Sequence, residues 1–132
     1  MTGNNLSVWA VTTQNEPSMG LFISSDWNAI GWTPKHQVEW LEKDLIPLFQ
    51  AKNISTKIFV LDDNRIFVPN WVDTLFLSEI LRNYTHGVAM HWYWDDFVPA
   101  SVIGKMQEKY PEKEIIGSEA CSVRGERLKI LK

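Results

Sequence analysis

The chain has little cysteine, no excess of positive charge and no long apolar run. These absences argue against an internal disulfide, a nucleic-acid-binding surface and a transmembrane segment. Cys121 is the single cysteine, so no disulfide forms within the chain and cysteine usage does not indicate a compartment. The net charge of −3 and the pI of about 5.6 predict no basic surface for nucleic acid and no polybasic membrane patch. No apolar run reaches the roughly 18 residues of a transmembrane segment. Residues 1–5 lack the features of a signal peptide.

Tryptophan and glycosylation sequons, in contrast, are abundant. Seven tryptophans occur among 132 residues, and tryptophan is frequent where an apolar face meets a ligand. Sequons of the form Asn-X-Ser/Thr begin at Asn5, Asn53 and Asn83. They permit glycosylation and favour a secretory or lysosomal protein, although chance also produces such triplets. An apolar content of 45% and a charged content of 22% are typical of a globular domain with its own core.

Strand and helix signals alternate along the chain. The expected strands are Leu6 to Val11, Lys57 to Leu61, Gly87 to Trp92 and Ile115 to Ser118. Helices should begin at Pro34 after the N-cap Thr33, near Pro69 or Asn70, and at Pro99, while Pro47 should kink or end the first helix and Pro111 should stop the third. The apolar faces expected to point inward are Val38, Leu41, Leu45 and Leu48 in the first helix, Val72, Leu75, Phe76 and Ile80 in the second, and Val102, Ile103 and Met106 in the third.

The order βαβαβαβ, with connections long enough for right-handed crossovers, predicts an α/β fold with a parallel sheet. Two architectures fit: an open doubly wound sheet, or about half of a (β/α)8 TIM barrel. The strands are apolar throughout, as expected when both faces of the sheet are covered. No Gly-x-Gly-x-x-Gly follows a strand, so nothing supports a dinucleotide site. The chain divides into one domain over residues 1–121 and a basic tail over residues 122–132.

Polar residues gather where the strands end. The clusters are Gln14-Asn15-Glu16, Asp62-Asp63-Asn64-Arg65, His91-Trp92-Tyr93-Trp94-Asp95 and Ser118-Glu119. The carboxyl ends of parallel strands share one face, where barrel enzymes place their active sites. Glu16 and Glu119 should therefore converge, and two carboxyl groups facing one sugar are the minimum equipment for glycoside hydrolysis. The alternative for either glutamate alone is an exposed or salt-bridged carboxylate.

Five segments carry a family signature. They are Trp9 to Ser18 (WAVTTQNEPS), Gly31 to Gln37 (GWTPKHQ), Leu61 to Arg65 (LDDNR), His86 to Tyr93 (HGVAMHWY) and Ser118 to Cys121 (SEAC). In this order and spacing they resemble glycoside hydrolase family 30, in particular its lysosomal glucosylceramidases. The resemblance implies that the four expected strands are strands four to seven of a TIM barrel. The first three strands, the eighth strand and the accessory β-domain of the family are missing, and residues 122–132 do not resemble it.

The resemblance also implies roles for individual residues. Glu16 would be the general acid/base and Glu119 the nucleophile of a retaining β-glycosidase. The substrate-binding residues would be Asn15, which would hydrogen-bond the sugar 2-hydroxyl, Tyr93, which would position the Glu119 carboxylate, and His91 and Trp92, which would line the pocket. From the residues alone, Trp92 as a core side chain and His91 as a buried, hydrogen-bonded histidine stay open.

No metal and no cofactor is expected. Asp62 and Asp63 with His86 or His91 offer suitable ligand types, but two histidines five residues apart on a strand face opposite sides. Cys121 has no histidine motif to activate it, and a small buried residue is its expected role.

The resemblance implies a parent glycosidase that hydrolyses the β-glucosidic bond of glucosylceramide with retention. It also implies a glycolipid substrate, a lysosomal activator protein as a partner, and a lysosomal or secretory location. The alternative is a catalytically inactive, truncated half-barrel that binds at most a sugar or a partner protein. A third interpretation, an unrelated open-sheet binding domain, requires the five matches to be accidental.

Overall fold

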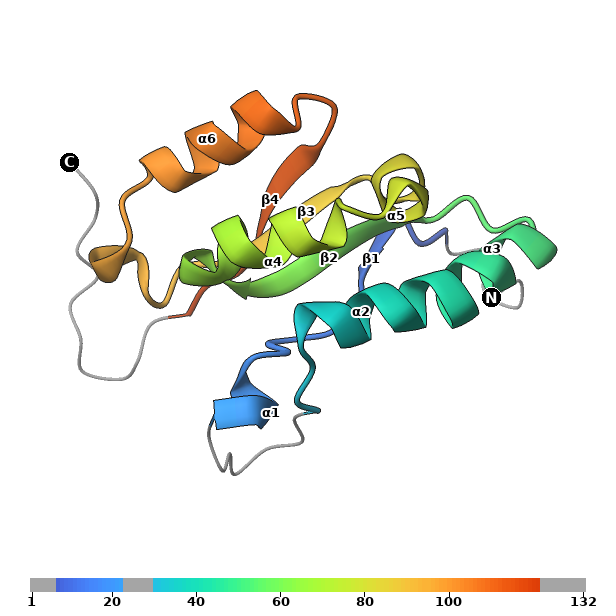
Figure 1. Cartoon of the computed structure of the whole chain (residues 1–132), viewed down its shortest axis with the longest axis horizontal. Helices are drawn as coiled ribbons and strands as arrows, with labels where there is room; N and C mark the ends of the chain where they lie inside the picture. The colour runs from blue at the N-terminus through green and yellow to red at the C-terminus, as the bar shows by residue number, and fades with distance from the viewer. Residues whose placement is uncertain (1–6, 23–29, 122–132) are drawn as a thin grey trace.

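A four-stranded parallel sheet forms the centre of the structure. The computed structural model describes residues 7–22 and 30–121. The strands are β1 (Ala10–Thr12), β2 (Lys57–Asn64), β3 (Gly87–His91) and β4 (Glu114–Glu119), and they lie side by side in that order, all parallel (Figure 1). The predicted alternation of parallel strands and helices is confirmed. Strand β2 continues three residues beyond its predicted end because Asp63 and Asn64 still pair with β3.

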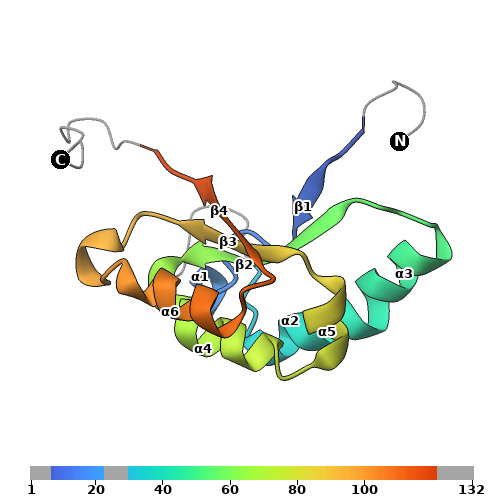
Figure 2. The ribbon, with the colours of Figure 1, turned by 90° about the horizontal axis from the view of Figure 1, so that it is seen from above.

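The helices lie on one face of this sheet. They are α1 (Met19–Phe22), α2 (Pro34–Trp40), α3 (Ile46–Ala51), α4 (Val68–Leu75), α5 (Glu79–Tyr84) and α6 (Ser101–Lys109), with single 3₁₀ turns at Arg65–Phe67 and Asp95–Phe97. In Figure 2 helices α2 to α6 run below the sheet, while β1 and β4 curve away from them. A doubly wound sheet would carry helices on both faces. The chain is therefore a half-barrel, which decides between the two architectures that the sequence left open.

The first helical segment begins as predicted but passes Pro47 without ending. Thr33 caps α2: its side chain accepts from the His36 amide, and its own amide donates to His36 Nδ1, both at 3.3 Å. A π-helical turn over Leu41–Leu45 precedes Pro47, and the chain stays helical to Ala51. Proline lacks an amide hydrogen, so the wider turn is where the helix accommodates it.

The hydrophobic core lies between the helices and strands β2 and β3. Among the residues predicted to face inward, Leu41, Val72, Leu75, Phe76 and Met106 are buried, and Val38, Leu45, Val102 and Ile103 pack against them. Two predictions are wrong, because Leu48 is 49% and Ile80 is 54% exposed. Leu48 follows the π-helical turn, which rotates the later residues, and Ile80 belongs to the separate helix α5.

The two edge strands differ from the expectation that both faces of every strand are covered. Strands β2 and β3 are almost wholly buried, whereas β1 and β4 consist of intermediate and exposed residues. The reason is topological, since among the described residues β1 pairs with β2 alone and β4 with β3 alone. Among the residues described, no helix has the length and apolarity to span a membrane.

Candidate active site

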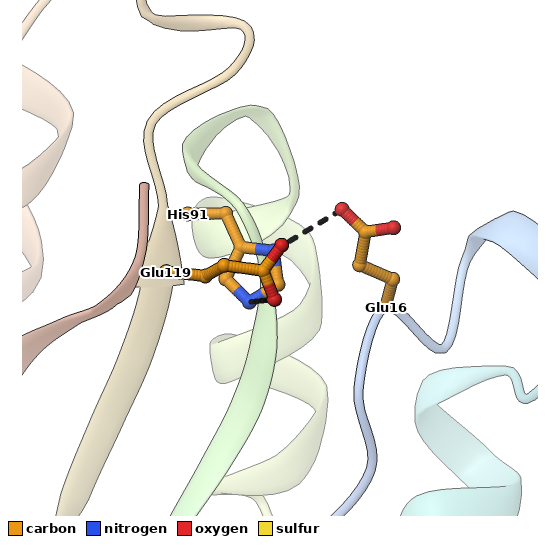
Figure 3. Close-up of side chains that lie close together, drawn as sticks. All are labelled: Glu16, His91 and Glu119. Atoms are coloured by element: carbon orange, nitrogen blue, oxygen red, sulfur yellow. Dashed lines mark hydrogen bonds and ion pairs between the residues drawn. The ribbon is translucent and has the colours of Figure 1, made fainter. Parts of the chain in front are cut away.

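The carboxyl ends of the strands bring together side chains from both edges of the sheet. Glu16 follows β1, His91 ends β3 and Glu119 ends β4. One carboxylate oxygen of each glutamate and one ring nitrogen of His91 lie within 4.8 Å of one another. Figure 3 shows both carboxylates directed toward the imidazole. The structure thus juxtaposes the two glutamates that the sequence predicts to converge.

His91 lies at the centre of this cluster and is only 2% exposed. Its Nδ1 is 3.1 Å from Glu16 Oε1, its Nε2 is 3.2 Å from Asp62 Oδ1, and the same Nε2 is 3.8 Å from Glu119 Oε2. Burial disfavours the charged imidazole, but the hydrogen bonds to Asp62 and Glu16 outweigh it and raise the pKa of His91 above its ordinary value. His91 therefore links the two glutamates electrostatically.

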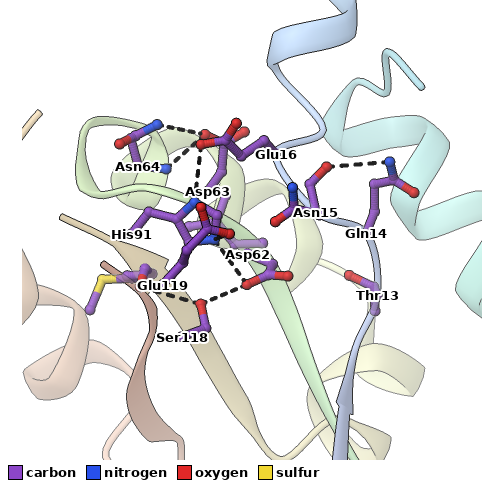
Figure 4. A network of polar contacts seen from close by, with 12 residues as sticks. Thr13, Gln14, Asn15, Glu16, Asp62, Asp63, Asn64, His91, Ser118 and Glu119 are labelled. Carbon is purple, nitrogen blue, oxygen red and sulfur yellow. Dashed lines mark hydrogen bonds and ion pairs between the residues drawn. The ribbon is translucent and has the colours of Figure 1, made fainter. Parts of the chain in front are cut away.

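Asp62 supports His91 from beneath, as Figure 4 shows. Its Oδ1 accepts a hydrogen bond of 2.6 Å from the Ser118 hydroxyl in addition to its contact with the imidazole. Burial favours the neutral carboxyl, yet the hydrogen bonds from His91 and Ser118 outweigh it and lower the pKa of Asp62. A buried carboxylate of this kind is stable only when it is paired.

The segment that carries Glu16 is anchored by backbone and side-chain contacts. Glu16 has a positive φ of 43°, and its amide donates to the Asp62 carbonyl at 2.8 Å. Two residues later, the Ser18 amide donates to Asp63 Oδ2 at 2.9 Å. Because both contacts end on β2, the position of the Glu16 carboxylate depends on that strand.

Glu119 has fewer supports. The Tyr93 hydroxyl donates to its Oε1 at 2.8 Å and lies 3.4 Å from Cys121 Sγ. The contact with the thiol, together with burial and the Glu119 carboxylate, raises the pKa of Tyr93, so the phenol stays a hydrogen-bond donor. Cys121 is exposed, and its predicted burial is wrong, because it follows the outer strand β4, whose single neighbour in the described part of the chain is β3.

Two open cavities flank the glutamates. The first has a volume of about 390 Å³ and is lined by Asn15, Glu16, Met19, Asn64, Tyr93, Trp94 and Glu119. The second, of about 410 Å³, includes His91, Trp92, Ser118 and Glu119. Both volumes are within the usual range for small-molecule sites. Trp92 is 42% exposed and so does not belong to the core, which resolves one alternative from the sequence.

Three polar residues of the site had no catalytic or substrate-binding role in the sequence prediction. They are Asp62, Asn64 and Ser118, which all lie in the strand-end clusters. Their location at the carboxyl end of a strand was the feature of the sequence from which a role in the site could have been predicted. The sequence does not, however, predict the register shift between Leu61 and Asp63, which determines the direction of the Asp62 side chain.

The cluster of Glu16, His91 and Glu119 also has the donor types of a cation site. The ring nitrogens of His91 already face Glu16 and Asp62 at hydrogen-bonding distance, so these contacts account for the arrangement without an ion. His86 takes no part, because its Nδ1 accepts from the Ile58 amide at 3.2 Å. That no metal is needed stays a prediction.

The fold and the position of its polar residues define a segment of a TIM barrel with its site at the carboxyl edge of the strands. Comparison with protein families gives a more specific result. The model for the "Glycosyl hydrolase family 30 TIM-barrel domain" matches residues 1–129, and the chain belongs to this family.

Individual relatives agree with this membership. The chain is 36% identical to lysosomal acid glucosylceramidase of Mus musculus over 117 residues, which are 88% of this chain and 23% of that protein. Among solved structures, SrfJ from Salmonella typhimurium superposes with a TM-score of 0.71 at 20% identity, covering 89% of this chain and 27% of its own. The endo-β1,6-glucanase BT3312 gives a TM-score of 0.73 at 24% identity, covering 84% and 24%. The chain therefore spans about a quarter of each relative, and the two structures support the fold alone.

Proposed function

We propose that this chain contributes the catalytic pair of a retaining β-glycosidase, with Glu16 as general acid/base and Glu119 as nucleophile. The observation that carries the proposal is the approach of one oxygen from each carboxylate to within 4.8 Å. Retaining glycosidases have carboxyl groups about 5–5.5 Å apart, whereas inverting enzymes leave about 6.5–9.5 Å for a water molecule. An approach of two individual oxygens to within 4.8 Å is compatible with the shorter spacing, and it supports the proposal of a covalent glycosyl-enzyme intermediate.

The partners of the two glutamates support their assignment. Glu16 faces His91 Nδ1, a group that can accept or return a proton, as a residue that alternates between acid and base requires. Glu119 accepts from Tyr93, a donor that orients the carboxylate without neutralising it, as a nucleophile requires. Asn15 lies at the wall of the same cavity, where an amide could bind a sugar hydroxyl.

The proposed substrate of the complete protein is a β-glucoside of the glucosylceramide type. The 36% sequence identity to a lysosomal acid glucosylceramidase supports this choice, and so does the surface beside the site. Trp92 and Trp94, which line the two cavities, are 42% and 40% exposed. Aromatic side chains at such a rim would suit a sugar joined to an apolar tail. A lysosomal or secretory location and a lysosomal activator protein as a partner belong to the same proposal.

The test is covalent trapping with a 2-deoxy-2-fluoroglucoside, followed by peptide mass spectrometry, in a complete family 30 barrel that carries these four strands. We expect the label on Glu119, and none in Glu119→Gln. Glu16→Gln should slow substrates with poor leaving groups most, because activated leaving groups need little proton donation. Glu108→Gln, an exposed position on α6, is the matched control and should behave as the wild type. A label on Glu16 would reverse the roles, and a label on neither glutamate would refute the pair.

A second candidate concerns the 132-residue chain by itself: a catalytically inactive half-barrel that binds a sugar or a partner protein. It is favoured by the open sheet, in which β1 and β4 each have one neighbour among the residues that the structure describes, and by the 44% exposure of the Glu119 side chain. A loosely positioned nucleophile loses much of its catalytic effect. Hydrolysis of a fluorogenic β-glucoside by the isolated chain, abolished in Glu119→Gln, would exclude this candidate.

A further inference from the structure

Asp62 occupies an irregular position in β2. Leu61 and Asp62 have positive φ angles of 71° and 59°, and the register with β3 shifts between Leu61 and Asp63. A left-handed conformation costs a residue other than glycine on the order of 1–2 kcal/mol. A bulge can redirect a side chain next to a functional site. Here both consecutive carboxylates are buried, with Asp62 toward His91 and Asp63 toward the amides of Ser18 and Asn64.

The contacts of Asp62 form one connected path. Ser118 Oγ donates to Asp62 Oδ1 at 2.6 Å, Asp62 Oδ1 lies 3.2 Å from His91 Nε2, and His91 Nδ1 lies 3.1 Å from Glu16 Oε1 (Figure 4). Asp62 and His91 are 5% and 2% exposed, so water competes little for these contacts. The path therefore runs without a gap from the outer strand to the proposed acid/base.

Counting protons restricts the states of this path. A neutral imidazole has one N–H, whereas the ring of His91 faces a carboxyl group on each side. Both contacts can be hydrogen bonds in three ways: the ring carries two protons, Glu16 is protonated and donates to Nδ1, or Asp62 is protonated and donates to Nε2. The hydrogen bonds from His91 and Ser118 lower the pKa of Asp62 and so disfavour the third state. In the other two states the Nε2 hydrogen points to Asp62.

We propose that Asp62 is a positioning residue that fixes the Nε2–H of His91 toward itself, so that Nδ1 shares a proton with Glu16. Ser118 orients the Asp62 carboxylate in turn. This inference deepens the proposed function and rests on the assignment of Glu16 as acid/base. When Glu16 gives the shared proton to a leaving oxygen, the neutral ring keeps its Nε2–H toward Asp62 and so keeps its orientation, with the Nδ1 lone pair toward Glu16. The proton that Glu16 takes from water in the second step then restores the hydrogen bond to Nδ1.

Other ionisable groups around the ring are few among the residues described. Glu119 Oε2 is 3.8 Å from Nε2, but its side chain is 44% exposed, which screens its charge. Tyr93 packs edge-on with its ring centroid 6.0 Å away. Burial destabilises the charged ring, and the hydrogen bonds to Asp62 and Glu16 are the main interactions that stabilise it. This balance is consistent with the raised pKa of His91.

The test is a histidine titration by ¹⁵N NMR on the full 132-residue chain. We expect Asp62→Asn to weaken proton binding by His91 about tenfold or more, since an ion-paired neighbour typically changes a pKa by about 1–3. The nitrogen shifts should also report loss of the Nε2–H form of the neutral ring. Glu119→Gln is the matched control, because it removes another nearby carboxylate without touching the path, and it should have a smaller effect. His36 and His86 serve as internal references for an intact fold.

Ser118→Ala provides a milder variant in case Asp62→Asn does not fold. It should shift the His91 titration in the same direction as Asp62→Asn but by a smaller amount. Ser118→Thr keeps the hydroxyl, so its His91 titration should match that of the wild type. A His91 titration that is unchanged in both Asp62→Asn and Ser118→Ala would overturn the proposal. Because the titration needs no turnover, its failure would leave Glu16 and Glu119 as the catalytic pair. Failure to label Glu119 would, conversely, leave the titration result standing.

Discussion

Gln37 is the buried side chain whose removal gives the sharpest test of how the site is supported. It lies in α2 with no exposed surface and connects three elements. Its Nε2 donates to Thr13 Oγ1 at 2.7 Å, and its Oε1 accepts from Trp71 Nε1 at 2.9 Å and from the Leu61 amide at 3.4 Å. Thr13 precedes the Glu16 segment and Leu61 precedes Asp62. The substitution Gln37→Leu keeps the volume and deletes every one of these bonds.

The expected loss follows from the groups left behind. The Trp71 indole N–H becomes a buried donor without an acceptor, which costs about 1–3 kcal/mol. The longer bond to the Leu61 amide adds less. We therefore expect Gln37→Leu to lower the free energy of unfolding by about 2–3 kcal/mol, a large share of the roughly 5–15 kcal/mol typical of a domain.

Urea denaturation followed by tryptophan fluorescence measures this change. The control is Gln50→Leu on the exposed surface of α3, which should stay within about 0.5 kcal/mol of the wild type. The double variant Gln37→Leu/Trp71→Phe removes both partners, so its loss should be smaller than the sum of the single losses by about 1–2 kcal/mol. Equal stabilities of Gln37→Leu and Gln50→Leu would refute this account of the site's support.

Three further predictions concern the cap, the pH dependence and the sheet edges. Thr33→Ala should lower the free energy of unfolding by about 1 kcal/mol, because it removes the acceptor for the His36 amide; an unchanged denaturation midpoint would contradict the cap. The raised pKa of His91 stabilises the fold fully below its unfolded value near 6.5, and this contribution is lost as the pH rises through the folded value. The stability advantage of wild type over His91→Gln should accordingly shrink above about pH 6.5 in denaturation series, and an advantage independent of pH would refute the link. The isolated chain should self-associate in light scattering, because in the described part of the chain β1 and β4 are edge strands that each pair on one side; a monodisperse monomer would oppose this.

The sequence predicted the parts of the fold that depend on local patterns. The Thr33-Pro34 start of α2, the four parallel strands and the inward faces of α4 and α6 follow from capping preference, apolar runs and helical spacing. The errors arose where an irregular turn or the position of a strand in the sheet decides the burial of a side chain. Leu48 is exposed because the preceding π-helical turn rotates the helix, and Cys121 is exposed because no further strand within residues 7–22 and 30–121 covers β4.

The candidate site shows the same division. The convergence of Glu16 and Glu119 could be predicted because parallel strands share a carboxyl edge, wherever their residues stand in the sequence. The contact of Asp62 with His91 could not be predicted, because the alternation of an ideal strand would direct Asp62 and Asp63 to opposite faces. The positive φ angles of Leu61 and Asp62 break that alternation, and they are a property of the folded sheet.

The two proposed catalytic residues are supported unequally, and the sheet topology explains why. Glu16 is joined to the central strand β2 through the Asp62 carbonyl and to β3 through His91, and its side chain is 12% exposed. Glu119 ends an edge strand, its one short contact is with Tyr93, and its side chain is 44% exposed. The central strands exclude water and fix the imidazole, so they determine the geometry of the proposed acid/base. The proposed nucleophile stands on an edge strand and has fewer contacts among the described residues, which is why a complete barrel is the proper setting for testing its reaction.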